Sequence, residues 1–519
     1  MKLKNEKKKI YFNIDLIKVY SILFFLILTW IVAICLLEGN YQFNPVFVIG
    51  MVVISFLALC FVYKKLSKKF EKMSNKSTWI FYGCVVIVMV ILQYIIGYLV
   101  RTDPSWDLGL CIQSAKEILQ YGHSTDMAVY YIQAPNNIFI TLMLAIVIKF
   151  FSFFQLQDVN VATLIANIVL IQLAILLLFK ITKSVFNNFT ACFTLVIMFL
   201  FLPIYPYSTI MYTDTTSMFL PLGFLYCFIK IYQMPNDKKK YIYAAIMGAL
   251  AFISLSLKVT ALIVLIAFVI HEIIQKRLLQ MLKIMGVTLI TFLVIEVSYT
   301  SIIKNTGIMG IPYEDTKQIP FTHFVMMGMY GSGAFSAEEW QFTLKLPDYE
   351  TRKEANIQKI KERLKSYGTQ GYIKFLNKKI KGQTWGSGTY DFESILNSYN
   401  VDDNIAHQFL LTNGKYYRIV FYYCQIFHFT MLLGIIVSIG YSIKQGKKEN
   451  SIISISKLSI LGLLIFLLLW ETRSRYMLNF IPVYILVFVS GIAYFQKDSK
   501  KIFSKLFLKE DDEQEKPLT

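Results

Sequence analysis

Two aspartates stand four residues apart in the segment RTDPSWDLGL (residues 101–110), directly after an apolar run. Asp103 precedes Pro104, which is typical of a helix N-cap followed by proline at the first helical position. Asp107 then falls in the first turn, where the helix dipole favours a carboxylate. Because a positioned carboxylate can take a proton from a hydroxyl group, both are candidate catalytic bases. Capping for Asp103, and simple solvation for Asp107, are the alternatives.

A third acid, Asp214, lies in the segment YSTIMYTDTT, where a loop rich in proline and tyrosine meets the next apolar run. One interpretation is that Thr213, Asp214 or Thr215 caps the helix that follows. The other is that Asp214 faces Asp107 across a cleft and takes part in the chemistry. In that case Tyr212 is a candidate contact for a sugar or an acceptor.

Basic side chains stand near these acids at the ends of other apolar runs. Arg473 and Arg475 occupy the short ETRSR loop with Glu471, and arginine forks suit phosphate oxygens. Lys258, isolated between two apolar runs, and Arg101 are further candidates for a phosphate site, and snorkelling to lipid head groups is the alternative for Lys258. A base that deprotonates an acceptor, together with cations that offset charge on a departing phosphate, suits group transfer from a lipid phosphate.

The composition indicates that membrane-spanning segments position these side chains. Of the 519 residues, 56% are hydrophobic and only 16% are charged, and the mean hydropathy is +0.52, so the chain is predicted to be a polytopic membrane protein. The formal charge of +19 comes from short basic tracts between apolar runs, which indicates positive-inside bias rather than nucleic-acid binding. The seven cysteines are scattered and indicate neither a disulfide framework nor a cysteine metal site.

Thirteen apolar runs are long enough to be considered as spans. They are residues 15–37, 45–63, 78–100, 137–155, 161–180, 188–204, 213–233, 241–257, 259–274, 284–303, 418–442, 452–470 and 476–495. Basic tracts should be cytoplasmic, and they occur at residues 1–9, 64–76, 180–183, 238–240, 276–283, 444–448 and 497–505.

All the basic tracts can lie on the cytoplasmic side only if one of the apolar runs between Arg101 and Lys180 does not cross the membrane. The run 137–155 is the weaker, because it begins with APNN and ends in a phenylalanine cluster suited to an interface. We expect it to be re-entrant or to lie on the surface, which leaves about 12 transmembrane helices and both termini inside. The alternative is that it spans and Lys180 violates the bias. Four polar features then share the outer face, namely 101–136, 205–214, 304–415 and 471–475.

The motifs DPSWD, LGLCIQSAKEIL, APNN, YTDT and WETRSRY resemble the polytopic GT-C glycosyltransferases. The likeness is in particular to bacterial relatives of protein O-mannosyltransferases and aminoarabinose transferases, which use polyprenyl-phosphate sugars. The resemblance implies that Asp107 is the general base, that Asp214 is the second acid, and that Arg473 and Arg475 hold the lipid phosphate. The chain departs from the family pattern at Leu108, where an acid is usual, and in two extra spans at its start. Both the acceptor and a requirement for a divalent cation (Mg or Mn) therefore stay open.

The resulting prediction is an all-α, GT-C-like membrane protein with a small, mainly helical extracytoplasmic domain. The predicted parts are residues 1–77 (a two-helix extension), 78–303 (core), 304–415 (extracytoplasmic domain), 416–495 (last spans) and 496–519 (cytoplasmic tail). Within 304–415, His323 and Trp385 belong to segments rich in glycine and aromatic residues that are suited to covering a sugar.

The predicted function is transfer of a sugar from a polyprenyl-phosphate donor to an extracytoplasmic acceptor at the bacterial plasma membrane. The acceptor is a cell-envelope glycan, a teichoic acid, a glycolipid or a protein. The other expected partners are membrane lipids, and no nucleic acid is expected. A transporter or flippase of lipid-linked saccharides is the alternative, and it would use intramembrane charges, for which His271, Glu272 and Glu296 are the candidates. A non-catalytic assembly protein would need neither the outer acids nor the arginines.

Overall fold

The computed structural model describes residues 15–38, 43–103, 106–126, 128–310, 318–396 and 404–507, and the regular structure in these ranges is entirely helical. The bundle consists of α1 (Leu16–Leu37), α2 (Pro45–Lys69), α3 (Asn75–Leu99), α7 (Val159–Val185), α8 (Asn188–Phe199), α10 (Phe219–Gln233), α11 (Lys240–Leu257), α12 (Ile263–Ile274), α13 (Leu278–Thr306), α19 (Tyr417–Gln445), α20 (Ser451–Leu469) and α21 (Ile481–Phe507).

The other helices lie beside the bundle or in its connections. They are α4 (Asp107–Tyr121), α5 (Ala128–Gln133), η1 (Pro135–Asn137), α6 (Ile138–Ser152), η2 (Leu202–Ile204), η3 (Pro206–Thr209), α9 (Thr213–Thr216), η4 (Val259–Leu262), α14 (Phe321–Met327), α15 (Ala337–Leu344), α16 (Tyr349–Lys379), η6 (Ile380–Thr384), α17 (Phe392–Leu396), α18 (Ile405–Leu410), η7 (Gly446–Lys448) and η8 (Ser474–Phe480).

The described residues contain eleven helices long and apolar enough to cross a membrane, or up to twelve if α8 and the bent segment after it form one broken span. The bend between these two pieces is 69°. Two helices differ from the expectation. The helix at Pro135–Ser152, in the run that was expected not to cross, meets the length test and is counted among the eleven. The helix at Val259–Ile274, in a run that was expected to cross, is shorter than a full span. The all-helical, polytopic fold is confirmed, with about the expected number of spans.

Contacts between helix ends bring the basic tracts together at one end of the bundle. The backbone N–H of Lys447, after α19, donates to Asp15 Oδ2 before α1 over 3.1 Å. The side chain of Asn188, at the start of α8, donates to the carbonyl of Met73 before α3 over 2.8 Å. We call this end, where α1, α3, α8 and α20 begin, the inner end, and the opposite end the outer end. The grouping is the one that the positive-inside rule predicts.

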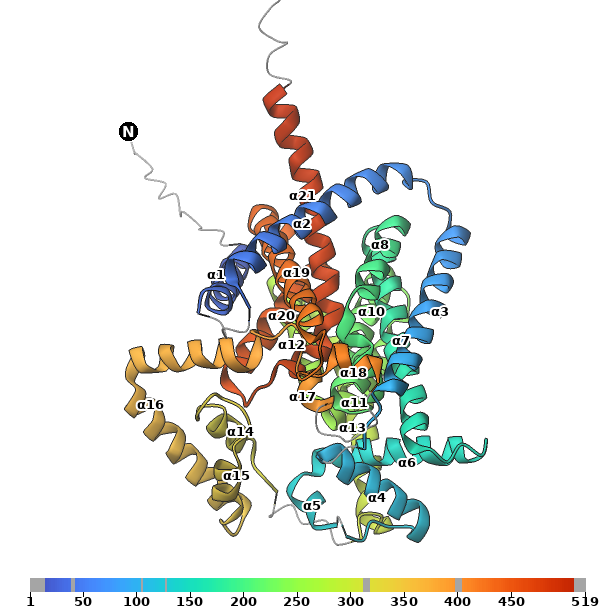
Figure 1. Cartoon of the computed structure of the whole chain (residues 1–519), viewed down its shortest axis with the longest axis vertical. Helices are drawn as coiled ribbons and strands as arrows, with labels where there is room; N and C mark the ends of the chain where they lie inside the picture. The colour runs from blue at the N-terminus through green and yellow to red at the C-terminus, as the bar shows by residue number, and fades with distance from the viewer. Residues whose placement is uncertain are drawn as a thin grey trace, which may run out of the picture.

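Helix α6 runs across the bundle at the outer end. Figure 1 shows it lying across the direction of α3 and α7, beside α4, with α5, α14 and α15 at the same end of the molecule. Helix α4 packs along α6. This arrangement agrees with the expectation of a surface-lying helix for residues 137–155 and with the gathering of 101–136 and 304–415 on one face.

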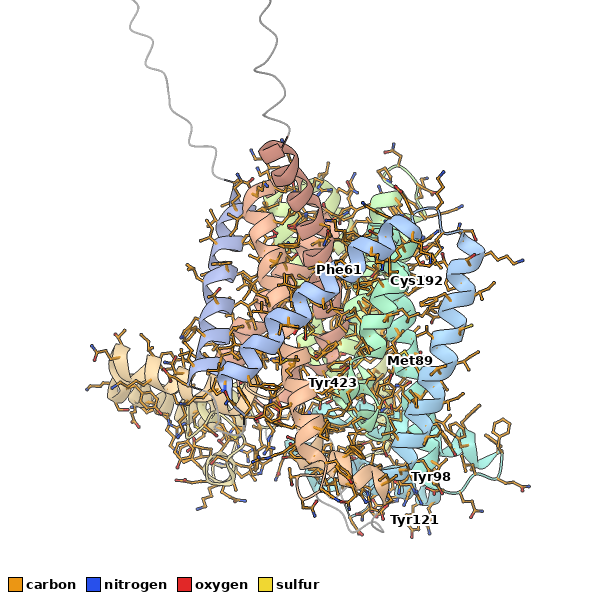
Figure 2. The ribbon with its side chains drawn as sticks, turned by 45° about the horizontal axis from the view of Figure 1, so that its top comes forward. Phe61, Met89, Tyr98, Tyr121, Cys192 and Tyr423 are labelled. Atoms are coloured by element: carbon orange, nitrogen blue, oxygen red, sulfur yellow. The ribbon has the colours of Figure 1, made fainter. Side chains whose placement is uncertain are left out.

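The outside of the bundle is apolar, as a bilayer requires. Figure 2 shows Phe61 on α2, and this side chain is 64% exposed. Met89 on α3, in contrast, is fully buried, and 94% of the residues in the apolar stretch within Ser474–Gln496, which includes the first part of α21, are buried inside the bundle. Tyr98 and Tyr121, at the ends of α3 and α4, both lie at the outer end in Figure 2.

The segment between α13 and α19 forms the outer part of the molecule. Helix α16 is kinked at Gly368, whose φ of +54° is in the region that favours glycine. Its first limb packs on α14 and α15, and its second limb runs back to the bundle (Figure 1). The kink therefore lets one helix cover the outer helices and also reach the membrane level.

Candidate functional site

Helix α4 presents Asp107 at its first position. Its N-cap is Trp106, and Gly122 closes it in the left-handed conformation with a φ of +82°. Its buried face includes Leu108, Cys111, Ile112 and Ala115. The prediction that Asp103 caps this helix is wrong, because the helix starts four residues later. Asp103 instead accepts a hydrogen bond of 2.7 Å from Asn160 at the start of α7. Pro104 lies outside the described residues.

Asp107 is exposed, and a chain of hydrogen bonds orients its carboxylate. The hydroxyl of Tyr130 donates to Asp107 Oδ1 over 2.9 Å. The side-chain amide of Asn137 donates to the Tyr130 oxygen, and the hydroxyl of Tyr212 donates to Asn137 Oδ1 over 3.1 Å. Burial, followed by the negative charge of Asp107, raises the pKa of Tyr130, so this hydroxyl keeps its proton and remains a donor. The remaining oxygen of Asp107 faces no described hydrogen-bond donor.

Asp214 is buried and paired with two cations. Lys258 Nζ lies 2.5 Å from its Oδ1, and Arg475 Nε lies 3.8 Å from its Oδ2. The capping alternative for Asp214 is wrong, because Tyr212 is the N-cap of α9. The snorkelling alternative for Lys258 is also wrong, because Lys258 binds a carboxylate instead of lipid head groups. Asp214 and Asp107 are connected only through intermediate side chains, so the prediction that they face each other across a cleft is not supported.

The loop that carries Asp214 is held by one amide. The side chain of Asn167, on α7, donates to the carbonyls of Tyr207, Ser208 and Ile210 at 2.9 to 3.1 Å. The loop is buried throughout, so these carbonyls need partners from the protein. Asn167 therefore fixes the backbone that leads to Asp214.

Aromatic rings join the acid at α4 to the cations at η8. The Trp106 ring packs edge-on against Tyr212, with ring centroids 4.9 Å apart. The guanidinium of Arg475 lies 4.9 Å from the centroid of Trp106, and the ammonium of Lys258 lies 4.3 Å from the centroid of Tyr476. Such cation–π contacts hold a cation in place without neutralising it. The sequence did not single out Trp106 as a site residue, although it lies in the DPSWD motif.

Two further acids adjoin the arginines. Tyr476 donates a hydrogen bond of 2.8 Å to Glu471, and burial raises the pKa of Glu471 against the opposing charges of Arg475 and Arg473. Burial likewise raises the pKa of Asp391, and hydrogen bonds from Ser474 and the charges of Arg473 and Arg475 oppose this shift. Asp391 has a φ of +64°, which is uncommon for aspartate and marks a strained turn. The sequence analysis missed Asp391, and its only signal there was its place in the segment TWGSGTYDFES.

Arg473 differs from Arg475 in its pairing. It is half-buried, it precedes η8 in extended conformation, and within the described ranges it has no ion pair within 4 Å. Its charge influences Asp391 and Glu471 only at longer range. Arg473 is therefore the cation most available to an added anion.

Lys379, at the end of α16, clamps the outer segment to the loop that carries these arginines. Its fully buried ammonium donates to the carbonyls of Gly328, Leu468 and Trp470 at 2.9, 3.0 and 2.6 Å. Burial lowers the pKa of Lys379 to about 7, and the negative charge of Glu471 opposes the shift. Nothing in the local sequence around Lys379 indicates this contact, which joins residues about 90 positions apart.

Three of the predicted site residues lie elsewhere. Arg101 donates to the carbonyl of Tyr98 over 2.7 Å and stacks on its ring at 3.8 Å, away from the paired cations. His323 is fully buried, and burial lowers its pKa to about 4; its Nδ1 hydrogen-bonds Thr343. Trp385 is also fully buried. Neither ring offers an exposed face to a sugar, so this expectation receives no support, whereas Tyr212 belongs to the site.

The residues that the structure describes contain no group of three or more His, Cys, Asp or Glu side chains placed to hold a metal ion. Both oxygens of Asp214 face cations of the protein instead. The requirement for Mg or Mn that the resemblance allows therefore stays a prediction.

Residues 12–494 match a family model described as a conserved hypothetical integral membrane protein, so the chain belongs to this family. No curated protein matches the sequence. Among solved structures, the oligosaccharyltransferase of Archaeoglobus fulgidus in complex with Zn and sulfate is similar at 12% identity and a TM-score of 0.44, over 82% of this chain and 51% of that chain.

A second similar structure is the archaeal oligosaccharyltransferase AglB from the same organism, in complex with an inhibitory peptide and a dolichol-phosphate. Its identity is 12% and its TM-score is 0.39, over 86% of this chain and 53% of that chain. The chain thus spans about half the length of these neighbours. At this level of similarity an activity has to be argued from the site itself.

Proposed function

We propose that this integral membrane protein is a glycosyltransferase that moves a sugar from a polyprenyl-phosphate donor to an extracytoplasmic acceptor. The observation that carries the proposal is that the helix of the exposed carboxylate Asp107 meets Arg475 through Trp106, and that Asp214 pairs Arg475 with Lys258 at the outer end of the bundle. Arg473 stands two residues before Arg475. Asp107 and these arginines come from segments more than 360 positions apart in the sequence. A lipid-linked donor presents its phosphate at this level of a membrane.

Asp107 is the proposed general base. Its carboxylate takes the proton of an acceptor hydroxyl while that oxygen attacks the anomeric carbon of the donor sugar. The bond between that carbon and the phosphate oxygen breaks, and the polyprenyl phosphate leaves with the electron pair. This single displacement inverts the anomeric carbon. Tyr130, by donating to one oxygen of Asp107, leaves the other oxygen to receive the proton.

The cations are proposed to bind the donor phosphate. Arg473, which has no ion pair of its own within the described ranges, makes the first contact. Lys258 and Arg475 are held in place by Asp214, which we assign as a positioning residue because both of its oxygens face cations. Charge-assisted hydrogen bonds from such groups stabilise the phosphate most when it leaves as an anion. No step is assigned to a metal ion.

The positive-inside bias supports an orientation in which the site faces outward from a bacterial plasma membrane. The acceptor is then an envelope glycan, a teichoic acid, a glycolipid or a protein. The test is the glycan composition of the envelope in a deletion strain, complemented with the wild-type chain or with Asp107→Asn. A missing sugar that only the wild-type chain restores supports the proposal, and an unchanged composition contradicts it.

A flippase of lipid-linked saccharides is the second candidate, because intramembrane charges do occur. Lys457 and Glu449 pair at 2.6 Å with no exposed surface, and Arg277 lies 3.3 Å from Glu272. These charges are paired with one another at the inner end, away from the outer cluster. A flippase requires movement of intact donor lipid across proteoliposomes, whereas a transferase releases the sugar from the phosphate. Measuring both products in one preparation separates the two functions.

A further inference from the structure

A cavity of about 160 Å³ lies next to the site, between the start of α6, the end of α11 and the end of α13. Its lining includes Asn136, Ser256, Glu296 and Lys304 as well as apolar side chains. Two of the lining segments continue directly into the site. Asn136 precedes Asn137, which bonds Tyr130 and Tyr212, and Ser256 stands two residues before Lys258.

One side of the cavity is aromatic and apolar. The rings of Phe139 and Tyr299 line it and pack edge-to-face, with centroids 5.9 Å apart, and Phe252 packs on both of them. Leu255, also in the lining, is 45% exposed on the outside of the bundle. A hydrocarbon chain can therefore reach this side of the cavity from the bilayer.

The other side contains a carboxylate well inside the membrane-spanning helix α13. Glu296 lies eight residues before Lys304, which places it about 12 Å deeper along the helix. It is half-buried, and it accepts a hydrogen bond of 3.3 Å from the hydroxyl of Thr300. Lys304 is exposed at the end of the helix. An ionisable side chain at such a depth normally marks a binding or transport site.

We propose that this cavity binds a neutral, hydroxyl-bearing head group carried on a hydrocarbon chain. The Glu296 carboxylate accepts hydrogen bonds from sugar hydroxyls, and the rings of Phe139 and Tyr299 cover the apolar face of a sugar. The same carboxylate repels a phosphate, which excludes the donor head group from the deep part of the cavity. The proposed function then makes this amphiphile the acceptor, a glycolipid, whereas binding itself does not depend on that function.

The experiment uses the full chain in lipid nanodiscs and an alkyl glucoside with a photoreactive diazirine in its alkyl chain. Labelling is expected at the start of α6 and at the ends of α11 and α13. Excess octyl glucoside should compete, and octyl phosphate should not. Glu296→Gln should weaken binding of the probe about tenfold or more, since a hydrogen bond to a charged group is lost. Glu354→Gln, an exposed acid on α16, is the matched control and should bind normally.

Ser256→Trp fills the cavity from its second wall and should remove the labelling, provided that thermal unfolding shows a folded chain. Labelling spread evenly over the bundle, or competition by octyl phosphate equal to that by octyl glucoside, would overturn the proposal. If probe binding follows these expectations but no sugar transfer occurs, the glucoside site stands and the proposed transferase function fails. If transfer occurs but Glu296→Gln binds the probe normally, the acceptor site lies elsewhere.

Discussion

Both ends of the helix bundle contain charged side chains that the bilayer or the protein interior shields, but the two ends pair them differently. At the inner end, Lys457 donates to Glu449, to Ser442 and to the carbonyl of Ser438 at 2.5 to 2.6 Å, and the ion pair has no exposed surface. An ammonium has three donors, so every donor of Lys457 is used. In the cluster at the outer end, Asp107 is exposed and Arg473 lacks an ion pair within the described ranges. We call the inner set of charges closed, because its members pair with one another, and the outer set open, because some of its members remain available. A closed set supports the fold, whereas an open set can bind a substrate.

The largest expected effect is on chemistry at the open end. Asp107→Asn keeps the shape of the side chain but removes its ability to take a proton, so transfer should fall by about 10²- to 10⁴-fold. Donor binding and thermal stability should persist. Turnover of a polyprenyl-phosphate sugar by purified protein measures the effect.

Asp103→Asn is the matched control for this change. Within the described ranges, Asp103 bonds Asn160 and no residue of the cluster, so its loss should leave turnover nearly normal. An active Asp107→Asn variant would remove Asp107 from the role of base. Asp214, next among the acids considered, would then have to be released from its two cations before it could accept a proton.

The second effect is on stability at the closed end. Lys457→Met leaves Glu449 buried without its cation, which typically costs about 3 to 5 kcal/mol. The double variant Lys457→Met and Glu449→Gln should recover much of this loss, because no unpaired charge remains. Thermal unfolding in detergent measures both. A single variant as stable as the wild type would show that water or another group reaches Glu449, and that the inner end is open as well.

The third effect is on phosphate binding. Arg473→Ala should weaken binding of a polyprenyl phosphate about ten- to a hundredfold, as expected for the loss of a charge-assisted hydrogen bond. Arg475→Ala should weaken binding of the polyprenyl phosphate by a similar factor, and it also removes one of the two cations that hold Asp214 in place. Arg101→Ala is the control, since Arg101 stacks on Tyr98. Equal binding by the Arg473 and Arg101 variants would remove Arg473 from the phosphate site.

The smallest effect concerns the clamp between the outer segment and the bundle. The pKa of Lys379 is about 7 in the folded chain and near its usual value in the unfolded chain, so between these values the unfolded chain binds more protons. Rising pH should therefore stabilise the wild type relative to Lys379→Met, by at most about 1.4 kcal/mol per pH unit above pH 7. Thermal unfolding of both proteins between pH 6 and 9 checks the sign. A difference that stays constant over this pH range would mean that Lys379 remains fully charged when folded.

Much of the fold could be predicted because membrane insertion depends on properties that are local in sequence. Apolar length and the distribution of basic tracts placed the spans, and the exclusion of 137–155 from the crossing helices agrees with the direction of α6 in Figure 1. The predicted start of helix α4 near Asp103 was wrong, and the reason is also local in the sequence. A proline after aspartate favours a helix start, but here the helix begins only at Asp107.

The site could be predicted only in part. Asp107, Asp214, Lys258, Arg473 and Arg475 were identified because charges are costly at a membrane and therefore informative there. Their pairing was not predicted. Lys258 was as compatible with lipid head groups as with Asp214, which lies 44 positions earlier in the sequence. His323 and Trp385 were chosen from composition, and composition cannot tell a ring that packs inside from one that faces a ligand.

The sequence by itself determined that this protein is an integral membrane protein, which ends of its helices share a side, and which charged residues stand at the outer side. These follow from hydrocarbon length and charge, which act on each segment separately. Only the tertiary structure decided that Asp214 is held by Lys258 and Arg475 and that Trp106 joins them to the helix of Asp107. It also decided that Lys379 reaches from the outer segment to the end of α20. Such contacts depend on how the helices pack against one another, and no local pattern encodes a partner that is tens or hundreds of residues away.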